Sequence, residues 1–538
     1  MSKITGSPNC YEFLVNCANG TDFDAVIQDE QTIKFSRLLK DIDSTADFLY
    51  AKGIRCGDCF TIFLPNCTQC FVAFYALNKI GAIANIVHPR TPPEVLRSTM
   101  EVTRSKGIFI SDSLAVKYAK MLSHTDSLCI FCSDSDYATG FGHTAIRVKE
   151  IAKFRGLGHL QGKNGYRYST VISSEAFEEI PRSDGSNVAA YLHGGGTTGE
   201  SKTIKLSSNA LNSLVEKIRK LDTGFHNGNE CSLITLPMFH AYGLDVALHF
   251  SLCNGFCCIP VPHFSADEVI RHIKKRNVTF MVGVPNMYRK IWEHKDFDGK
   301  HLAKLRLLFC GGDLVSEQLL MDFNKTLKKN NSSGKLMRGY GLTEVCSVCC
   351  TNTPANTKPN SIGKPLDGIT MEIWDNNKQR LPVNTVGEIA VKSSTLMEGY
   401  LTWQDLPNEG IYIDPQGGKW VLTGDLGYID EDGYMFFTGR KKRLIIISGH
   451  NVYPTDIENE VMSLPYVKEA CVVEAFSNNK PFIKLFVSLN STRQGAAVEA
   501  IKKYCSENLP LYYSPREVVV LPELPRTQLG KIDIIKLH

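Results

Sequence analysis

The chain has 538 residues, of which 43% are hydrophobic and 22% are charged, fractions that are ordinary for a folded protein. Its 60 Lys and Arg nearly balance its 56 Asp and Glu, so the net charge of +4 gives no support for a nucleic-acid partner, which usually requires a clustered basic face. The chain shows neither an apolar segment behind a basic start nor a run of about 18 apolar residues, so we expect no secretory signal and no integral membrane segment.

The 18 cysteines allow two interpretations. A chain of this length without an export signal does not need disulfide bonds, so we predict reduced, mostly buried thiols in a cytoplasmic protein. The pairs Cys56/Cys59 and Cys67/Cys70 leave a zinc site as an alternative. This alternative is disfavoured, because zinc ribbons usually separate their two pairs by about 15–20 residues.

In the first part of the chain, apolar residues at helical spacing alternate with short apolar runs, which predicts an α/β layered fold. The predicted helices are 33–52, ending at Gly53, and a second that begins at Cys70 and ends at Gly81. The predicted strands are 60–64, 82–89, 107–111 and 128–132. Residues 135–186 are rich in Gly, Ser and charge and are predicted to be connector.

From residue 187 the periodic patterns return. We predict strands at 187–195, 231–236, 278–283 and 305–310, a helix at 208–221, and a β-rich region at 360–438. After Arg440 a strand, a helix at 454–463, two strands and a helix at 497–507 form a unit of about 100 residues, a plausible separate domain. Thr455 and Glu458 are predicted to cap the first of these helices. The expected domains are therefore 1–439 and 440–538.

The segment from Tyr191 to Lys202 has the composition of a phosphate-binding loop. Glycines free the backbone to turn, and successive exposed N–H groups form a concave anion site. The residues that would serve this purpose are Gly195, Gly196, Thr197, Thr198, Gly199 and Lys202. An ordinary glycine turn between strand and helix is the alternative. A Walker A loop is excluded, because Glu200 follows Gly199 where that motif requires Lys.

This loop resembles the signature of the adenylate-forming superfamily, which includes acyl-CoA synthetases, coumarate-type CoA ligases, luciferases and peptide-synthetase adenylation domains. The family pattern is roughly (S/T)SGTTGxPKG. Ser201 replaces the usual Pro and Thr203 the usual Gly, whereas the phosphate-facing residues are kept. Further family motifs follow in order, and the resemblance spans residues 30 to about 535.

Two of these motifs imply an acid pocket. LPMFHAYGL at 236–244 resembles the family's aromatic–His segment and implies that His240 lies at the acid pocket and the thiol tunnel, with a catalytic role. CGGDL at 310–314 resembles the glycine loop beside adenine and acid, and implies nucleotide contacts from Gly311, Gly312 and Asp313. The acid pocket implied by the resemblance is formed by His240, Tyr242, Gly311 and Gly341.

The motif Gly339-Tyr340-Gly341-Leu342-Thr343-Glu344 resembles the family's adenine and magnesium motif. Tyr340 offers an aromatic face to the purine. The resemblance implies catalytic roles for Thr343, as a donor to the α-phosphate, and for Glu344, as a hard oxygen ligand for Mg²⁺. A plain helix start is the alternative for the Thr-Glu pair taken alone.

The remaining motifs imply a ribose site and a mobile domain. Asp425 in TGDLG would bind the ribose hydroxyls, as acidic residues do in other nucleotide sites, and Arg440 would bind ribose and phosphate oxygens. Lys442 matches the family's hinge, and Lys531 in LPRTQLGKID matches its catalytic lysine. The path of coenzyme A would be lined by Ser448, Gly449 and His450.

The resemblance implies an acid–thiol ligase with a large N-terminal domain of layered α/β subdomains plus a β-rich subdomain, and a small mobile α/β C-terminal domain. ATP with Mg²⁺ would convert a carboxylic acid, preferably a fatty or aryl acid, to acyl-AMP, and coenzyme A would accept the acyl group. Because few residues follow Lys531, we expect no fused carrier domain, but a free-standing carrier protein remains an alternative acceptor. A nucleotide-binding scaffold without catalysis is the second alternative.

Overall fold

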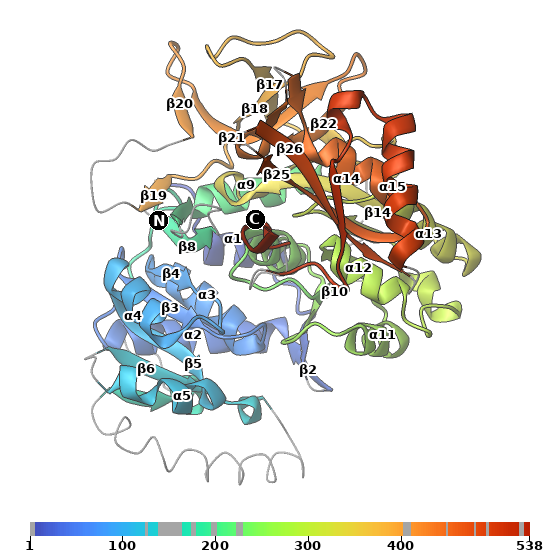
Figure 1. The fold of residues 1–538 in the computed structure, drawn as a ribbon. Helices are drawn as coiled ribbons and strands as arrows, with labels where there is room; N and C mark the ends of the chain where they lie inside the picture. The colour runs from blue at the N-terminus through green and yellow to red at the C-terminus, as the bar shows by residue number, and fades with distance from the viewer. Residues whose placement is uncertain are drawn as a thin grey trace.

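The computed structural model describes residues 6–28, 30–123, 127–137, 164–173, 179–194, 202–221, 230–401, 410–447, 450–477, 480–490, 494–526 and 532–537. Two large sheets with their helices form the lower part of the view in Figure 1. The orange β-rich strands lie above them, and the red C-terminal helices lie at the upper right. In the part of the chain that the structure describes, no helix is long and apolar enough to cross a membrane.

The first large sheet contains strands β3 Cys59–Phe63, β4 Ile83–Ile86, β5 Ser105–Ser111, β6 Leu128–Cys132, β7 Gly165–Arg167, β8 Val188–Gly194, β9 Lys202–Ser207 and β19 Gly399–Leu401. Their order is β19-β9-β8-β4-β3-β5-β6-β7. The strands from β8 to β7 pair in parallel, whereas β9 and β19 are antiparallel to their neighbours. β3 and β6 are buried along their whole length, as expected for parallel strands covered on both faces.

The second large sheet contains β1 Asp24–Gln28, β2 Gln31–Lys34, β10 Cys231–Ile234, β11 Cys257–Pro260, β12 Phe280–Gly283, β13 Leu307–Cys310, β14 Lys335–Leu342, β15 Ser347–Thr351 and β16 Lys364–Pro365. Their order is β16-β15-β14-β13-β12-β10-β11-β1-β2. This sheet is parallel from β14 to β1 and antiparallel at both ends. Ligands of such sheets bind at the carboxyl ends of the parallel strands. In this sheet the motifs at 236–244 and 310–314 lie at the ends of β10 and β13, and the motif at 339–344 includes the end of β14. The phosphate loop follows β8 of the first sheet.

Amphipathic or buried helices connect these strands. They are α1 Cys10–Ala18, α2 Phe35–Ala51, α3 Thr68–Ile80, α4 Pro93–Val102, α5 Asp112–Leu122, α8 Tyr168–Val171, α9 Ser208–Arg219, α10 Phe250–Cys253, α11 Ala266–Lys275, α12 Pro285–Trp292 and α13 Glu317–Lys329. A π-helical segment, η3 Tyr242–His249, leads into α10. Such segments are rare and occur frequently at functional sites.

Most of the β-rich region predicted at 360–438 forms a separate sheet, whereas its strands β16 and β19 join the two large sheets. The separate sheet contains β17 Thr370–Trp374, β18 Gly387–Lys392, β20 Ile411–Ile413, β21 Lys419–Ile429 and β22 Met435–Arg440. After a short turn, η6 Lys441–Arg443, the C-terminal unit contains β23 Ile445–Ile447, β24 His450–Val452, α14 Pro454–Met462, β25 Val467–Ser477, β26 Lys480–Leu489, α15 Gln494–Asn508 and β27 Glu517–Val520. This unit has its own apolar core, centred on Ile457, Leu485 and Ile501. The predicted fold class is confirmed, and the domain boundary at residue 440 stays a prediction.

Two local predictions need correction. Residues 135–186 are not connector throughout, because Gly165–Arg167 forms the edge strand β7, which pairs in parallel with β6. The predicted cap of α14 is wrong: the helix starts at Pro454, and Tyr453 occupies the cap position without a side-chain hydrogen bond. Glu458 instead accepts hydrogen bonds from the Val472 backbone and from Arg443, partners that are distant in the sequence.

Candidate active site

The predicted phosphate loop joins two strands that pair antiparallel, with Gly194 of β8 opposite Lys202 of β9. Gly195, Gly196, Thr197, Thr198, Gly199 and Ser201 lie outside the described residues. Lys202 is exposed at the start of β9. The base of the loop therefore holds Lys202 at the carboxyl end of β8, which is where a phosphate site is expected.

His193, which sequence analysis did not single out, lies at the base of this loop. Its ring nitrogens lie 2.7 Å from Asn85 Oδ1 and 3.1 Å from Thr203 Oγ1. Burial lowers the pKa of His193 to about 4, so the ring is neutral at pH 7. The hydroxyl of Thr203, which stands where the family usually has Gly, thus has a defined partner and ties β9 to β8.

Glu344, the predicted magnesium ligand, follows β14 in the short helical turn η5 Thr343–Val345. Its Oε1 accepts a hydrogen bond of 3.0 Å from the Tyr400 hydroxyl. The Lys202 Nζ lies over the same tyrosine ring, 4.9 Å from its centroid. The structure therefore brings the predicted metal ligand and the predicted phosphate lysine to one aromatic side chain. A carboxylate has about four acceptor sites, so Glu344 retains capacity for a cation.

The predicted acid-pocket residues gather where β13 and β14 end. A Cβ at Gly311 would lie 2.8 Å from the Gly339 carbonyl oxygen and 3.8 Å from the Tyr242 ring, and one at Gly341 would lie 1.5 Å from the Ser347 carbonyl oxygen. These two positions accept only glycine without a shift of the backbone. The Tyr242 hydroxyl donates to the Phe309 carbonyl at 3.4 Å.

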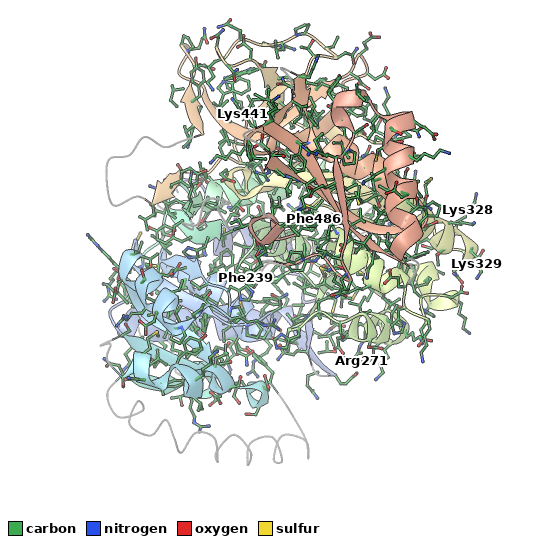
Figure 2. All side chains as sticks on the ribbon, in the orientation of Figure 1. Phe239, Arg271, Lys328, Lys329, Lys441 and Phe486 are labelled. Carbon is green, nitrogen blue, oxygen red and sulfur yellow. The ribbon has the colours of Figure 1, made fainter. Side chains whose placement is uncertain are left out.

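His240 lies two residues before η3. Its ring centroid lies 4.6 Å from that of Phe239, which in turn packs on His88 at 4.4 Å. Gly312 and Asp313 are exposed after β13, and Asp313 accepts a hydrogen bond from the Leu314 backbone. Phe239 is labelled in the middle of Figure 2.

The predicted ribose and adenine residues form one hydrogen-bonded group. Asp425 is only 2% exposed, and its Oδ2 accepts a bond of 2.7 Å from the Tyr340 hydroxyl. Arg440 Nε lies 2.8 Å from Oδ1 of the same carboxylate, because Asp425 and Arg440 face each other on β21 and β22. Burial, followed by the charge of Asp425, holds the pKa of Tyr340 well above its usual value. Residues that lie 85 positions apart in the chain thus share one site.

The predicted hinge residue Lys442 is exposed between two anchored neighbours. Lys441 Nζ lies 2.9 Å from Glu388 Oε2 of β18, in the β-rich sheet. Arg443 lies 2.6 Å from Glu458 Oε1 of α14, in the C-terminal unit. The chain is therefore held to the β-rich sheet just before Lys442 and to the C-terminal unit just after it. Figure 2 labels Lys441 beside the orange strands.

Two further predicted groups are only partly described. Ser448 and Gly449 lie outside the described residues, whereas His450 is exposed and stacks on Tyr512 at 4.4 Å. Lys531 also lies outside them. The chain on either side of Lys531 is held together by a bridge between Arg526 and Ile532.

The order and spacing of these groups correspond to a known family. Residues 13–401 match the family model described as AMP-binding enzyme, and residues 456–531 match that of the AMP-binding enzyme C-terminal domain. The chain belongs to the AMP-binding enzyme family.

Relatives of this AMP-binding enzyme include CoA ligases. A long-chain-fatty-acid–CoA ligase of Bacillus subtilis is 28% identical over 508 residues, which cover 93% of this chain and 88% of the relative. An indoleacetate–CoA ligase of Aromatoleum aromaticum is 28% identical, with coverage of 69% and 71%.

Solved structures share the fold. A crystal structure of an anthranilate CoA ligase in complex with anthranoyl-AMP has a TM-score of 0.84 at 20% identity and covers 100% of this chain and 98% of its own. An o-succinylbenzoate coenzyme A synthetase of Bacillus subtilis, in complex with ATP and magnesium, has a TM-score of 0.78 at 24% identity, with coverage of 99% and 100%.

Proposed function

We propose that this AMP-binding enzyme is an AMP-forming acid–thiol ligase that converts a carboxylic acid, ATP and coenzyme A to acyl-CoA, AMP and pyrophosphate. The observation that carries the proposal is a pair of polar clusters at the carboxyl end of β14. Glu344 and Lys202 meet at Tyr400, and Tyr340 bonds to Asp425, which pairs with Arg440. The names of the relatives, which are CoA ligases, support the thiol acceptor.

In the first step a carboxylate oxygen of the acid attacks the α-phosphorus of ATP, and the bond to pyrophosphate breaks. Catalysis of such displacements depends mainly on positioning and on stabilising charge. Asp425 would accept hydrogen bonds from the ribose hydroxyls, Thr343 would donate to the α-phosphate, and Lys531 would stabilise the charge that develops between the acid and the phosphate. The phosphate loop from Gly195 to Lys202 would hold the β- and γ-phosphates.

Magnesium fits the carboxylate donor present here. Mg²⁺ is typically held by one or two carboxylates together with substrate phosphates, and Glu344 offers a half-buried carboxylate that shares the Tyr400 side chain with Lys202. When bound, the ion neutralises phosphate charge. Glu344 would hold the ion at the end of β14.

In the second step the sulfur of coenzyme A attacks the acyl carbonyl carbon, and the bond to AMP breaks. Rotation of the C-terminal unit, 440–538, about Lys442 would withdraw Lys531 and bring Ser448, Gly449 and His450 toward the thiol path past His240. Closures of this kind let one site perform two reactions in sequence. The anchored neighbours of Lys442 support it as the pivot.

A fatty or aryl acid is the favoured substrate class, in a pocket that contains Tyr242, Gly311 and Gly341. The fatty-acid and indoleacetate ligases among the relatives support this class. We also propose a cytoplasmic location, because all eighteen cysteines are free thiols, the state expected in a reducing compartment.

The test is incubation of the purified protein with ATP, Mg²⁺, coenzyme A and separate pools of fatty acids, aryl acids and amino acids, with detection of products by mass spectrometry. We expect acyl-CoA from a fatty or aryl pool. Detection of acyl-AMP without acyl-CoA would indicate that the acceptor is a free-standing carrier protein and not coenzyme A. ATP binding without either product would contradict the ligase and favour a non-catalytic nucleotide-binding scaffold.

A further inference from the structure

Sequence analysis assigned no role to Tyr400, yet this residue contacts two charged groups of the site. Its hydroxyl donates to Glu344 Oε1 at 3.0 Å, and the ammonium of Lys202 lies 4.9 Å from its ring centroid. A hydrogen bond to a carboxylate is stronger than a neutral one. An ammonium within about 6 Å of a ring centroid is attracted to the ring face. One side chain thus contacts a carboxylate through its edge and a cation through its face.

The backbone around Tyr400 is bonded to the segments that carry both partners. β19 adds to the edge of β9 in antiparallel register. The Glu398 N–H donates to the Lys205 carbonyl at 2.8 Å, and the Met397 N–H donates to the Glu344 carbonyl at 2.9 Å. The segment 397–401, which includes β19, therefore bridges β9 of the first large sheet and the turn that follows β14 of the second sheet.

We propose that Tyr400 is a positioning residue of the magnesium–ATP site: its hydroxyl orients the Glu344 carboxylate and its ring orients the Lys202 ammonium. This inference rests on the proposed function, since it deepens the nucleotide site of the ligase. Tyr400 acts through these two groups and does not touch the reacting atoms.

The expected size of the effect follows from the behaviour of groups that support metal ligands. Carboxylates that bind metals are themselves hydrogen-bonded, and removal of such a supporting partner typically costs about 10–100-fold in metal affinity or activity. Loss of the Tyr400 hydroxyl leaves Glu344 able to rotate, so an ordering cost is then added to metal binding. Binding of ATP without a metal does not use the Glu344 carboxylate, and it keeps the contribution of Lys202 as long as the ring remains.

The experiment compares Tyr400→Phe with the wild type by calorimetric titration of ATP, with and without Mg²⁺. The control is Tyr412→Phe, a tyrosine that packs against Trp374 in the β-rich sheet. We expect Tyr400→Phe to weaken binding of magnesium–ATP by about 10-fold, with metal-free ATP binding and the melting temperature unchanged. Tyr412→Phe should match the wild type. Equal affinity of Tyr400→Phe and the wild type for magnesium–ATP would overturn the proposal.

A double-mutant cycle separates positioning from a general structural role. If Tyr400 acts through Glu344, the effect of Tyr400→Phe on magnesium–ATP binding must disappear in a Glu344→Gln background. Persistence of the full effect in that background would assign it to packing and would contradict the proposal. Both measurements are binding equilibria, so they test the role of Tyr400 even if the acid pools yield no acyl-AMP. That outcome would contradict the proposed ligase function but not the proposed role of Tyr400.

Discussion

At the scale of single residues, several ionisable side chains that are half-buried or fully buried are neutral. His193 at the base of the phosphate loop is one, and it has a polar partner at each ring nitrogen. Asp245 of η3 is another: it is 0% exposed, and burial holds the pKa of its carboxyl well above the usual value. The protonated form of Asp245 therefore belongs to the folded state, since an unpaired charge is costly to bury.

The buried Asp245 predicts a pH dependence of stability. Above about pH 4 the unfolded chain loses this proton, whereas the folded chain retains it. The folded state then binds more protons, so the free energy of unfolding falls as pH rises toward the folded pKa. Asp245→Asn cannot titrate and should escape this loss. We expect the melting temperature of the variant minus that of the wild type to increase from pH 5 to pH 8. A difference that does not change with pH would contradict a raised pKa.

At the scale of secondary-structure elements, close contact between β14 and β15 shapes the site. Gly341 lies on β14 where its backbone meets that of Ser347, and a Cβ there would lie 1.5 Å from the Ser347 carbonyl oxygen. Because the obstacle is backbone, the two strands would have to separate. Glu344 follows three residues later, so its position depends on this contact.

Gly341→Ala should therefore destabilise the protein and weaken ATP binding together. Overpacking typically costs about 1–3 kcal/mol, and a contact this short predicts the upper end of that range or more. The measurement is chemical unfolding combined with ATP titration. Gly194→Ala is the control for stability, because its Cβ would meet Ile204 Cδ1 at an ordinary 3.4 Å. Equal stabilities of the two variants would show that β14 and β15 do not constrain this position.

Much of the arrangement of elements could be predicted from the sequence. Continuous apolar runs such as 128–132 predicted buried strands correctly, because a strand covered on both faces must be apolar throughout. Contacts between distant segments could not be predicted in the same way. His193 finds Asn85 across the pairing of β4 with β8, and Tyr400 finds Glu344 in the turn after β14 of the other large sheet. Glu458 caps no helix because a neighbouring strand offers it Val472. No local pattern encodes such partners.

At the scale of the whole molecule, the C-terminal unit joins the rest of the chain through Lys442. The ion pairs Lys441–Glu388 and Arg443–Glu458 leave this residue as the place where the backbone dihedrals can change without breaking either anchor. In the domain alternation that we propose, the change in backbone dihedral angles therefore occurs mainly at Lys442.

Substitution of this residue by proline tests the pivot. Proline fixes φ near −65°, a value compatible with the 3₁₀ turn of η6 but resistant to a large rotation. We expect Lys442→Pro to retain one half-reaction, either acyl-AMP formation or thioester formation from supplied acyl-AMP, and to lose the other by at least about 100-fold, since misplacement of about 1 Å already has effects of that size. Lys442→Ala should retain both. Retention of both half-reactions by the proline variant would move the pivot elsewhere.

The central claim, activation of the acid through attack on the α-phosphorus, is tested most directly by oxygen transfer. The acid identified in the pools is labelled with ¹⁸O in both carboxylate oxygens and turned over with ATP, Mg²⁺ and coenzyme A. The account predicts one ¹⁸O in each AMP and one in each acyl-CoA, because the attacking oxygen leaves with AMP. Label in pyrophosphate or inorganic phosphate, with none in AMP, would contradict an acyl-adenylate.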